Sequence, residues 1–590
     1  MYFTYAFRRR KDAIKLHTLS PLLNHFFFCT TSNYESKLPL SSLQCGAILQ
    51  SLTNTKTFKK GQTLHGYIIS SGVIQDNIYL STKLAAFYAN CGHMSKSQII
   101  FDQIVNKSSF LWNFMIRGYA SNDLSVQAIL LYLKMRRGGV FSDNFTYPFV
   151  VKACGDLADV KLGHVVHAQV MIHGFESDIY VGNCLLSMYV KFSDMWNARI
   201  VFDRMPERDL TSWNTTISGY VKNGSPAEGL HVFQEMLVSG VNPDSTTLLG
   251  VLAACSELRC FETGKQVHGF LLRNRVHCPY NFLTNSLIEV YCICSSMVYA
   301  RRLFEVSRKD SVSWNTLISG YGRSDKGFEG LRLFRQMVAA SKRPDLATFI
   351  AVLGICEDVA ALDFGMSVHS RLVREGFGVS VMAATALIGM YSRCGELSCS
   401  RLIFDEIETK NLVSWTAMIS AYGHHGKGKE SISMLQQMRV NNIVPDEGTF
   451  TSILTACSHA GLVEEGREVF RQIHQEYNIK PVLAHYACLV DLLSRAGNLE
   501  DAYETICSMK VKPTVDIWAS FLSGCRVHGN VTLAEVAGEK ILQLNPDGVG
   551  GYICLSHIYA DEKRWTDVEK VRDMVQSKGT TKPTAYSFLK

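Results

Sequence analysis

The sequence predicts an all-α protein in which short helices pair and stack along the chain. Three observations lead to this prediction. The chain has 590 residues, more than one ordinary globular domain. A tryptophan recurs at intervals of 101 residues within closely similar phrases, such as "LTSWNTTISGY" and "SVSWNTLISGY". Between these phrases, apolar residues recur at helical spacing, and glycine and proline separate the segments.

Tryptophan, aspartate and cysteine all recur at this interval of 101 residues. They do so as Trp112, Trp213, Trp314 and Trp415, as Asp143, Asp244, Asp345 and Asp446, and as Cys154, Cys255, Cys356 and Cys457. The repeating segment divides into three units of about 35, 35 and 31 residues. A unit of this size accommodates one pair of short helices.

The unit 210–244 shows the expected helices best. Apolar residues in "SWNTTISGYVK" recur at helical spacing, and Asn223–Gly224 ends that segment. The sequence "SPAE" at 225–228 is expected to open a second helix, with the serine as N-cap, the proline at the first helical position and the glutamate completing a capping box. This helix should stop at Gly240.

Helices this short cannot bury their apolar faces as isolated pairs, so neighbouring pairs must stack around a continuous core. The repeated tryptophans are expected to pack between units. The repeated cysteines lie in apolar stretches such as "VLAAC", and they are expected to be buried small side chains and not disulfide partners.

Composition limits the class of protein. With 47% hydrophobic and 19% charged residues, the chain is expected to be ordered, and no uncharged apolar run is long enough for a membrane helix. The net charge of +7 arises within the first 60 residues, which hold nine Lys and Arg against two acids. The rest is balanced, so bulk charge does not indicate nucleic-acid binding.

The N-terminus has the composition of an organellar transit peptide. It carries Arg8, Arg9, Arg10, Lys11 and Lys15, scattered Ser and Thr, and a single acid before residue 33. A secretory signal is disfavoured because no apolar segment with a small-residue cleavage site follows the charges. The alternative is a disordered basic tail.

Two long segments carry a resemblance to a known family. "SWNTLISGYGRSDKGFEGLRLFRQM" and "HYACLVDLLSRAGNLEDAYETICSM" closely resemble the pentatricopeptide repeat proteins of plant organelles, in the class whose repeats alternate between standard, long and short forms. The resemblance implies a right-handed superhelical solenoid of helix-turn-helix repeats. It divides residues 42–514 into fourteen repeats. These are 42–77, 78–108, 109–143, 144–178, 179–209, 210–244, 245–280, 281–310, 311–345, 346–380, 381–411, 412–446, 447–482 and 483–514.

Residues 515–590, with "IWASFLSGCRVHGNVTLAEVAGEKILQLNPD", resemble the E extension of RNA-editing factors. The cytidine deaminase domain that often follows in that family needs zinc held in an H-x-E and P-C-x-x-C arrangement. The chain has one H-x-E, His474 to Glu476, and no CxxC. We interpret it as a solvated helix face, since one histidine supplies too few zinc ligands. The chain is therefore not expected to be an enzyme or to hold a metal or other cofactor.

The resemblance also implies how single-stranded RNA is read. One repeat addresses one base through the residue after the tryptophan position and the last residue of the unit. In this family, Asn first favours a pyrimidine and Thr a purine, while a final Asp favours keto bases and a final Asn amino bases. The pairs that imply uridine are Asn113/Asp143, Asn183/Asp209, Asn214/Asp244, Asn285/Asp310 and Asn315/Asp345. Thr385/Asn411 implies adenosine, and Thr416/Asp446 implies guanosine.

Short polar side chains can address a base without blocking it, and the alternative is that they merely face water. Read in order, the pairs imply the target 5′-U N U U N U U N A G-3′ upstream of an edited cytidine. Pro148, Leu249 and Ile350 in the long repeats depart from the pattern, because their side chains cannot hydrogen-bond a base edge. The pairs Thr82/Ser108 and Ala487/Thr514 imply no particular base.

The resemblance therefore implies a non-catalytic factor that specifies a C-to-U editing site in an organellar transcript. Its implied partners are single-stranded organellar RNA, a deaminase-bearing pentatricopeptide repeat protein acting in trans, and accessory editing factors. The expected compartment is the mitochondrion, with the chloroplast as the alternative. Two other functions stay open: an organellar RNA stability, splicing or translation factor, and a solenoid that binds protein.

Overall fold

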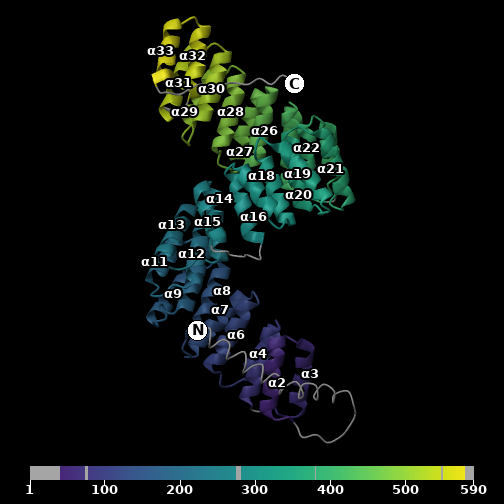
Figure 1. The fold of residues 1–590 in the computed structure, drawn as a ribbon, viewed down its shortest axis with the longest axis vertical. Helices are drawn as coiled ribbons and strands as arrows, with labels where there is room; N and C mark the ends of the chain where they lie inside the picture. The colour runs from purple at the N-terminus through teal and green to yellow at the C-terminus, as the bar shows by residue number, and fades with distance from the viewer. Residues whose placement is uncertain (1–39, 74–76, 274–280, 379, 546–548, 578–590) are drawn as a thin grey trace. The chain divides into compact units, whose positions relative to one another are not determined.

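The computed structural model of the chain describes residues 40–73, 77–273, 281–378, 380–545 and 549–577. These residues form 32 α-helices and no strand, which confirms the predicted all-α class (Figure 1). Within these ranges, none of the helices is both long enough and apolar enough to cross a bilayer. The predicted transit peptide at 1–41 lies outside the described residues except for Leu40 and Ser41.

The chain divides into two compact units, residues 1–290 and 291–590. The helices of the first unit are α2 Ser42–Thr55, α3 Phe58–Ser70, α4 Ile78–Asn90, α5 Met94–Gln103, α6 Ser109–Ser121, α7 Ser125–Arg137, α8 Tyr147–Leu157, α9 Val160–Ile172, α10 Ile179–Lys191, α11 Met195–Arg204, α12 Leu210–Lys222, α13 Pro226–Val238, α14 Ser245–Leu258 and α15 Phe261–Arg273. Helix α16, Asn281–Ile293, contains the boundary between the two units.

The helices of the second unit are α17 Met297–Val306, α18 Ser311–Gly322, α19 Gly327–Ala339, α20 Leu346–Asp358, α21 Leu362–Arg374, α22 Val381–Arg393, α23 Leu397–Glu406, α24 Leu412–His424, α25 Gly428–Val440, α26 Glu447–Ala460, α27 Val463–Gln475, α28 Leu483–Arg495, α29 Leu499–Ser508, α30 Val515–Val527, α31 Val531–Leu544, α32 Val549–Asp561 and α33 Trp565–Ser577. In both units the even-numbered helix is the first of its pair and the odd-numbered helix is the second.

Within each unit the pairs stack side by side. In the first unit, α12 packs against its partner α13 and against α14, the first helix of the next pair. In the second unit, α24, α26, α28 and α30 pack in succession, and second helices such as α25 and α27 contact the first helix that follows. This arrangement gives every pair a neighbour on which to bury its apolar face.

The repeated tryptophans pack between consecutive repeats, as predicted. Trp112, Trp213, Trp314 and Trp415 are nearly fully buried. Each meets a phenylalanine from the second helix of the preceding unit edge-on, with ring centres 4.7 to 5.0 Å apart. These phenylalanines are Phe101, Phe202, Phe304 and Phe404. Such edge-to-face pairs add to the stabilisation that burial alone provides.

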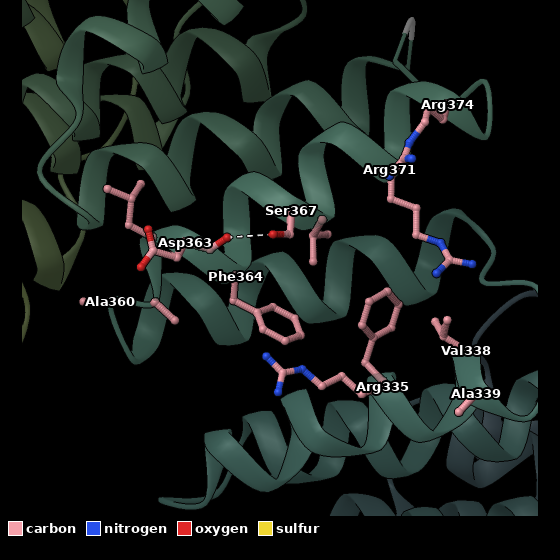
Figure 2. Close-up of a pocket in the computed structure, with 13 residues that line it drawn as sticks. Arg335, Val338, Ala339, Ala360, Asp363, Phe364, Ser367, Arg371 and Arg374 are labelled. Carbon is pink, nitrogen blue, oxygen red and sulfur yellow. Dashed lines mark hydrogen bonds between the residues drawn. The ribbon is translucent and has the colours of Figure 1, made fainter.

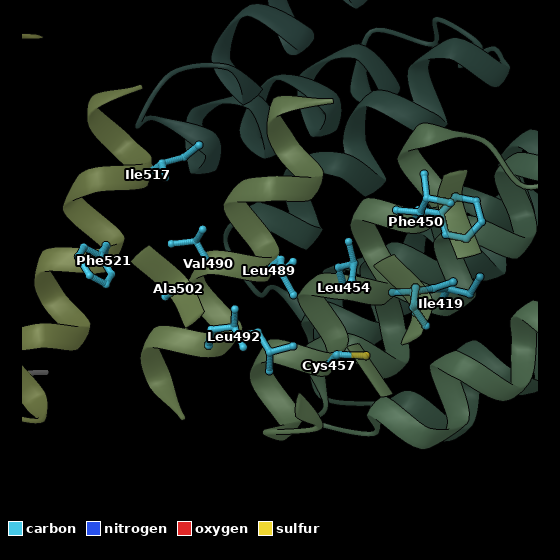
Figure 3. Packing of buried hydrophobic residues seen from close by; sticks show 14 of the residues in the cluster. Ile419, Phe450, Leu454, Cys457, Leu489, Val490, Leu492, Ala502, Ile517 and Phe521 are labelled. Carbon is cyan, nitrogen blue, oxygen red and sulfur yellow. The ribbon is translucent and has the colours of Figure 1, made fainter. Parts of the chain in front are cut away.

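The repeated cysteines are buried, also as predicted. Cys154, Cys255, Cys356 and Cys457 have no exposed surface. Figure 3 shows Cys457 beside Leu454 and Leu492 in the apolar core of the second unit. Burial raises the pKa of the Cys457 thiol to about 12, so this side chain is a neutral apolar group at physiological pH.

The helices predicted for 210–244 are present, but the predicted capping box is wrong. Gly224 and Gly240 both have positive φ, and Ser225 is the N-cap with Pro226 at the first position of α13. The Ser225 side chain makes no cap hydrogen bond. Its backbone N–H donates to Tyr220 at 2.9 Å, and its ψ of 58° differs from the extended backbone that usually aims an N-cap hydroxyl.

Candidate nucleic-acid interface

The asparagines of the predicted base-reading pairs lie on the first helices of their repeats. Four of them form a hydrogen bond with the last residue of the same repeat. Asn113, Asn183, Asn214 and Asn315 each donate an amide N–H to an aspartate 26 or 30 residues later. The Nδ2 to Oδ1 distances are 2.8 Å to Asp143, 3.1 Å to Asp209, 3.1 Å to Asp244 and 3.0 Å to Asp345. In four of the predicted pairs, the two side chains are therefore in direct hydrogen-bond contact.

The unit-final aspartates also begin the helix that follows. Asp209, Asp244, Asp345 and Asp446 are the N-caps of α12, α14, α20 and α26. Each accepts the backbone N–H of the third helical residue, and the hydroxyl of that Ser or Thr accepts the aspartate N–H in return. This exchange is a capping box, and it fixes the carboxylate at the junction of two units.

Asp143 reaches the same place by a different route. Its carboxylate accepts backbone N–H groups from Phe145 and Thr146 in a turn that precedes α8. The helix starts later here than in the other long repeats, with Thr146 as its N-cap and Pro148 in its first turn. The contact with Asn113 is nevertheless retained.

Hydrogen bonds lower the pKa of three of the unit-final carboxylates, those of Asp209, Asp244 and Asp345. Burial alone would raise the pKa of Asp244, but hydrogen bonds from Thr247 and Asn214 outweigh burial and lower it. The same balance lowers the pKa of Asp209 and Asp345, with Asn183 and Asn315 as the corresponding amide donors. An ionised carboxylate offers only acceptors to a ligand.

The pair Thr385/Asn411 is arranged differently. Thr385 donates its hydroxyl to the carbonyl of Val381 at 2.8 Å, inside its own helix. Asn411 is the N-cap of α24 and accepts the backbone N–H of Ser414 at 2.9 Å. Among the residues that the structure describes, no hydrogen bond joins Thr385 to Asn411.

Thr416 and Asp446 are linked through a third side chain. The Thr416 hydroxyl lies 3.0 Å from Oγ1 of Thr449, which donates to Asp446 at 2.8 Å. The remaining predicted pair is divided between the two compact units: Asn285 lies in α16, and Asp310 is the N-cap of α18.

Two cavities open beside pairs in the first unit. One, of about 300 Å³, is lined by Asn113 and Asp143 together with Phe110, Phe114, Arg117, Phe145 and Phe149. The other, of about 550 Å³, is lined by Asn183 and Asp209, and also by Tyr180, Lys152 and Lys191. Exposed rings such as Phe110, Phe145 and Tyr180 can stack on bases, and lysines can neutralise phosphates.

A larger cavity, of about 930 Å³, lies between the second helices α19 and α21 (Figure 2). Arg335, Arg371 and Arg374 line it, and the Arg335 guanidinium lies 5.0 Å from the centre of the Phe364 ring. No predicted base reader lines this cavity. Its size therefore does not make it the predicted interface.

The described residues hold no group of three or more histidine, cysteine and acidic side chains that could bind a metal. His474 and Glu476 are exposed at the end of α27, which confirms that they form a solvated face. Glu476 lies 3.6 Å from Arg439, so its carboxylate has a cationic neighbour.

The hydroxyl residue at the third position of the unit that follows a reading pair was not predicted from the sequence. This position is Thr146, Ser212, Thr247, Ser313, Thr348, Ser414 or Thr449, and it is buried in all seven cases. The sequence does contain a signal for this position: Asp or Asn is followed three residues later by Ser or Thr, a variant of the capping-box spacing. The pattern indicates a cap, but it does not show where the hydroxyl points.

The fold and the pairs define a helical-repeat protein in which, in four units, an asparagine on the first helix contacts the aspartate at the end of the same unit. Comparison with known proteins identifies the family. The PPR repeat family model matches residues 208–257 and 410–459. The PPR repeat model matches 110–140, 183–210, 312–341, 448–477 and 484–513, and the E motif model matches 528–588.

Relatives from Arabidopsis thaliana agree. The putative pentatricopeptide repeat-containing protein At3g05240 is 35% identical over 92% of this chain and 98% of its own length. The mitochondrial protein At2g03380 is 34% identical over 98% of this chain and 82% of its own length. The chloroplastic protein At3g63370 is 34% identical over 90% of this chain, which spans only 55% of that relative. The chain belongs to the pentatricopeptide repeat family.

Among solved structures, maize PPR10 is similar at 14% identity with a TM-score of 0.47, covering 91% of this chain and 94% of that one. PPR10 in complex with an 18-nt psaJ RNA element gives a TM-score of 0.48, covering 91% of both chains.

Proposed function

We propose that this chain binds single-stranded RNA in a plant organelle, specifies a C-to-U editing site there, and recruits a deaminase as a separate protein. The observation that carries the proposal is the repeated contact between the amide after the tryptophan and the carboxylate at the end of the unit. The E motif at 528–588 supports the editing role, since this extension is found in editing factors.

The chemistry of the pair suits the bases proposed for it. Uracil and guanine carry a ring N–H on their Watson–Crick edge, and an ionised carboxylate can accept it. Adenine and cytosine present a ring nitrogen acceptor there, which an asparagine N–H can meet. Asp244 and Asp345 therefore favour keto bases, and Asn411 favours an amino base. The Asn and Thr partners would then separate pyrimidines from purines.

The binding test is a change of code at one unit. Thr416→Asn keeps Asp446 and places an amide at the position that Asn315 occupies 101 residues earlier. The variant should prefer uridine where the wild type prefers guanosine. It should bind the native RNA more weakly and regain affinity when that one base is changed. One well-formed base contact changes discrimination by about 1 to 3 kcal/mol. Identical ranking of the two RNAs by both proteins, at one salt concentration, would contradict base reading.

The editing test compares organellar cDNA from plants with and without this protein. We expect one or a few cytidines, each downstream of a sequence matching 5′-U N U U N U U N A G-3′, to stay unedited in its absence. Normal editing with altered transcript abundance or splicing would instead favour the RNA-processing alternative. The same comparison in mitochondrial and chloroplast transcripts identifies the compartment.

A further inference from the structure

The third residue of each unit that follows a reading pair carries a hydroxyl. In most of these units, the orientation of the hydroxyl depends on whether the residue is threonine or serine. Thr146, Thr247 and Thr348 each donate to Oδ1 of the asparagine in the preceding unit. The distance is 2.6 Å in all three, to Asn113, Asn214 and Asn315. Thr449 differs from these three, because it faces a threonine, Thr416, at 3.0 Å and donates to Asp446 at the shorter distance of 2.8 Å.

Serine at this position turns back to its own cap residue. Ser212 donates to the carboxylate of Asp209 at 2.9 Å, and Ser414 donates to the backbone carbonyl of Asn411 at 2.8 Å. As a result, Oδ1 of Asn183 is buried with no hydrogen-bond partner among the described residues. A buried carbonyl oxygen without a hydrogen-bond partner destabilises the folded state relative to one that is hydrogen-bonded.

The covalent structure of the two residues accounts for part of the difference. Threonine is branched at Cβ, so its methyl group restricts χ1 and with it the direction of the hydroxyl. A hydroxyl has one proton to donate. Thr247 lies 2.6 Å from Asn214 but 2.9 Å from Asp244, so the shorter contact marks the amide as the main acceptor. Ser212 has no methyl group to hold it in that orientation.

The two ends of the reader amide are therefore held differently in the two kinds of unit. Asn214 is fixed at both ends: Oδ1 accepts from Thr247, and Nδ2 donates to Asp244. Rotation of its amide by half a turn would break both contacts. Asn183 is fixed only through Nδ2, by its contact with Asp209. Its carbonyl contributes no hydrogen bond that opposes rotation or displacement.

We propose that Thr146, Thr247 and Thr348 are positioning residues that make the preceding unit a strict reader of its base, whereas Ser212 and Ser414 leave the preceding unit permissive. This inference rests on the proposed function and adds a second determinant of specificity outside each reading pair. Strict readers are the units 109–143, 210–244 and 311–345. Permissive readers are 179–209 and 381–411.

The experiment exchanges the two hydroxyl residues. Thr247→Ser keeps a hydroxyl that can cap α14, as Ser212 caps α12, but removes the methyl group that directs it to Asn214. Ser212→Thr adds that methyl group beside Asn183. Each variant and the wild type are titrated at one salt concentration with the matched RNA. They are also titrated with RNAs in which guanosine, a purine that keeps the keto edge, replaces the uridine opposite unit 179–209 or unit 210–244.

We expect the wild type to discriminate more strongly opposite 210–244 than opposite 179–209. Thr247→Ser should weaken discrimination opposite its own reader by roughly two- to tenfold, the effect of one neutral hydrogen bond, and leave the other position unchanged. Ser212→Thr should strengthen discrimination opposite Asn183 alone. A residue with only a capping role would change thermal stability without changing base preference at one position.

The possible failures are distinguishable. If the wild type ranks bases equally strictly at both positions and the exchange changes neither, the positioning role is wrong while base reading stands. If neither position discriminates at all, base reading by these pairs is wrong. If Ser212→Thr lowers the melting temperature by steric clash, Thr247→Ser still decides the question, because it only removes a methyl group.

Discussion

In four units, a single carboxylate at the end of the unit contacts two neighbours. Asp345 accepts the backbone N–H of Thr348 to begin α20 in the next unit, and it accepts the amide N–H of Asn315 from its own unit. The recurrence of aspartate at this position therefore has a structural cause as well as a proposed functional one. Asn411 shows that the two roles can be separated, because it caps α24 in the same way with an amide.

The separation predicts the behaviour of Asp345→Asn. Asparagine is as good an N-cap as aspartate, so the free energy of unfolding should change by only a few tenths of a kcal/mol. Base preference opposite the unit 311–345 should shift from uridine to cytidine, because the carboxylate acceptor is replaced by an amide that can donate. Thermal unfolding and titration with the two RNAs measure the two effects.

Asp345→Ala is the matched control for this substitution. Loss of the cap should lower the free energy of unfolding by about 1 kcal/mol, and it should remove the preference between the two pyrimidines. If Asp345→Asn destabilised the protein as much as Asp345→Ala without changing base preference, the carboxylate would be a helix cap alone.

At the scale of the helix, the junction between units depends on the tryptophan at the start of the first helix. Trp415 in α24 is buried against Phe404 of α23, with ring centres 5.0 Å apart, so it fastens one pair of helices to the pair before it. Trp415→Ala should lower the free energy of unfolding by about 3 to 5 kcal/mol through loss of this contact and the cavity left behind.

Chemical denaturation of Trp415→Ala and Trp415→Phe measures this contribution. The phenylalanine variant keeps an aromatic edge against Phe404, and it also removes an indole N–H that has no hydrogen-bond partner among the described residues. Its loss of stability should therefore be clearly smaller. Equal losses for the two variants would show that the edge-to-face contact contributes little beyond burial.

The sequence was sufficient for the helices but not for the side chains between them. Periodicity predicted α12 and α13 because helical spacing and the positive-φ glycines act within a few residues. The Ser225 capping box failed because the backbone contact from Ser225 to Tyr220 sets that turn. The different orientations of Thr247 and Ser212 depend on contacts with a reader more than 25 residues away, which local patterns do not encode.

At the scale of the whole molecule, each repeat packs on its neighbours, so the proposed base preference of a repeat should depend on that repeat and the ones next to it. Within each compact unit, the described pairs of helices pack on the pairs beside them, so substitutions in distant repeats of one compact unit should act independently. The proposed reading pairs precede residue 447, whereas the E motif model matches 528–588. The proposed roles in RNA binding and deaminase recruitment are therefore assigned to different parts of the chain.

Deletion of residues 546–590 tests this separation. The cut removes α32, α33 and most of the E motif, but it keeps α30 and α31, and α30 packs on α28 and α29. Every proposed base reader remains, so affinity for the target RNA should be unchanged while editing in complemented plants is lost. Asn315→Ala is the control, because it should weaken RNA binding and editing together. If the deletion reduced binding as much as editing, the E region would be part of the RNA-binding surface, and recruitment would have to be assigned elsewhere in the chain.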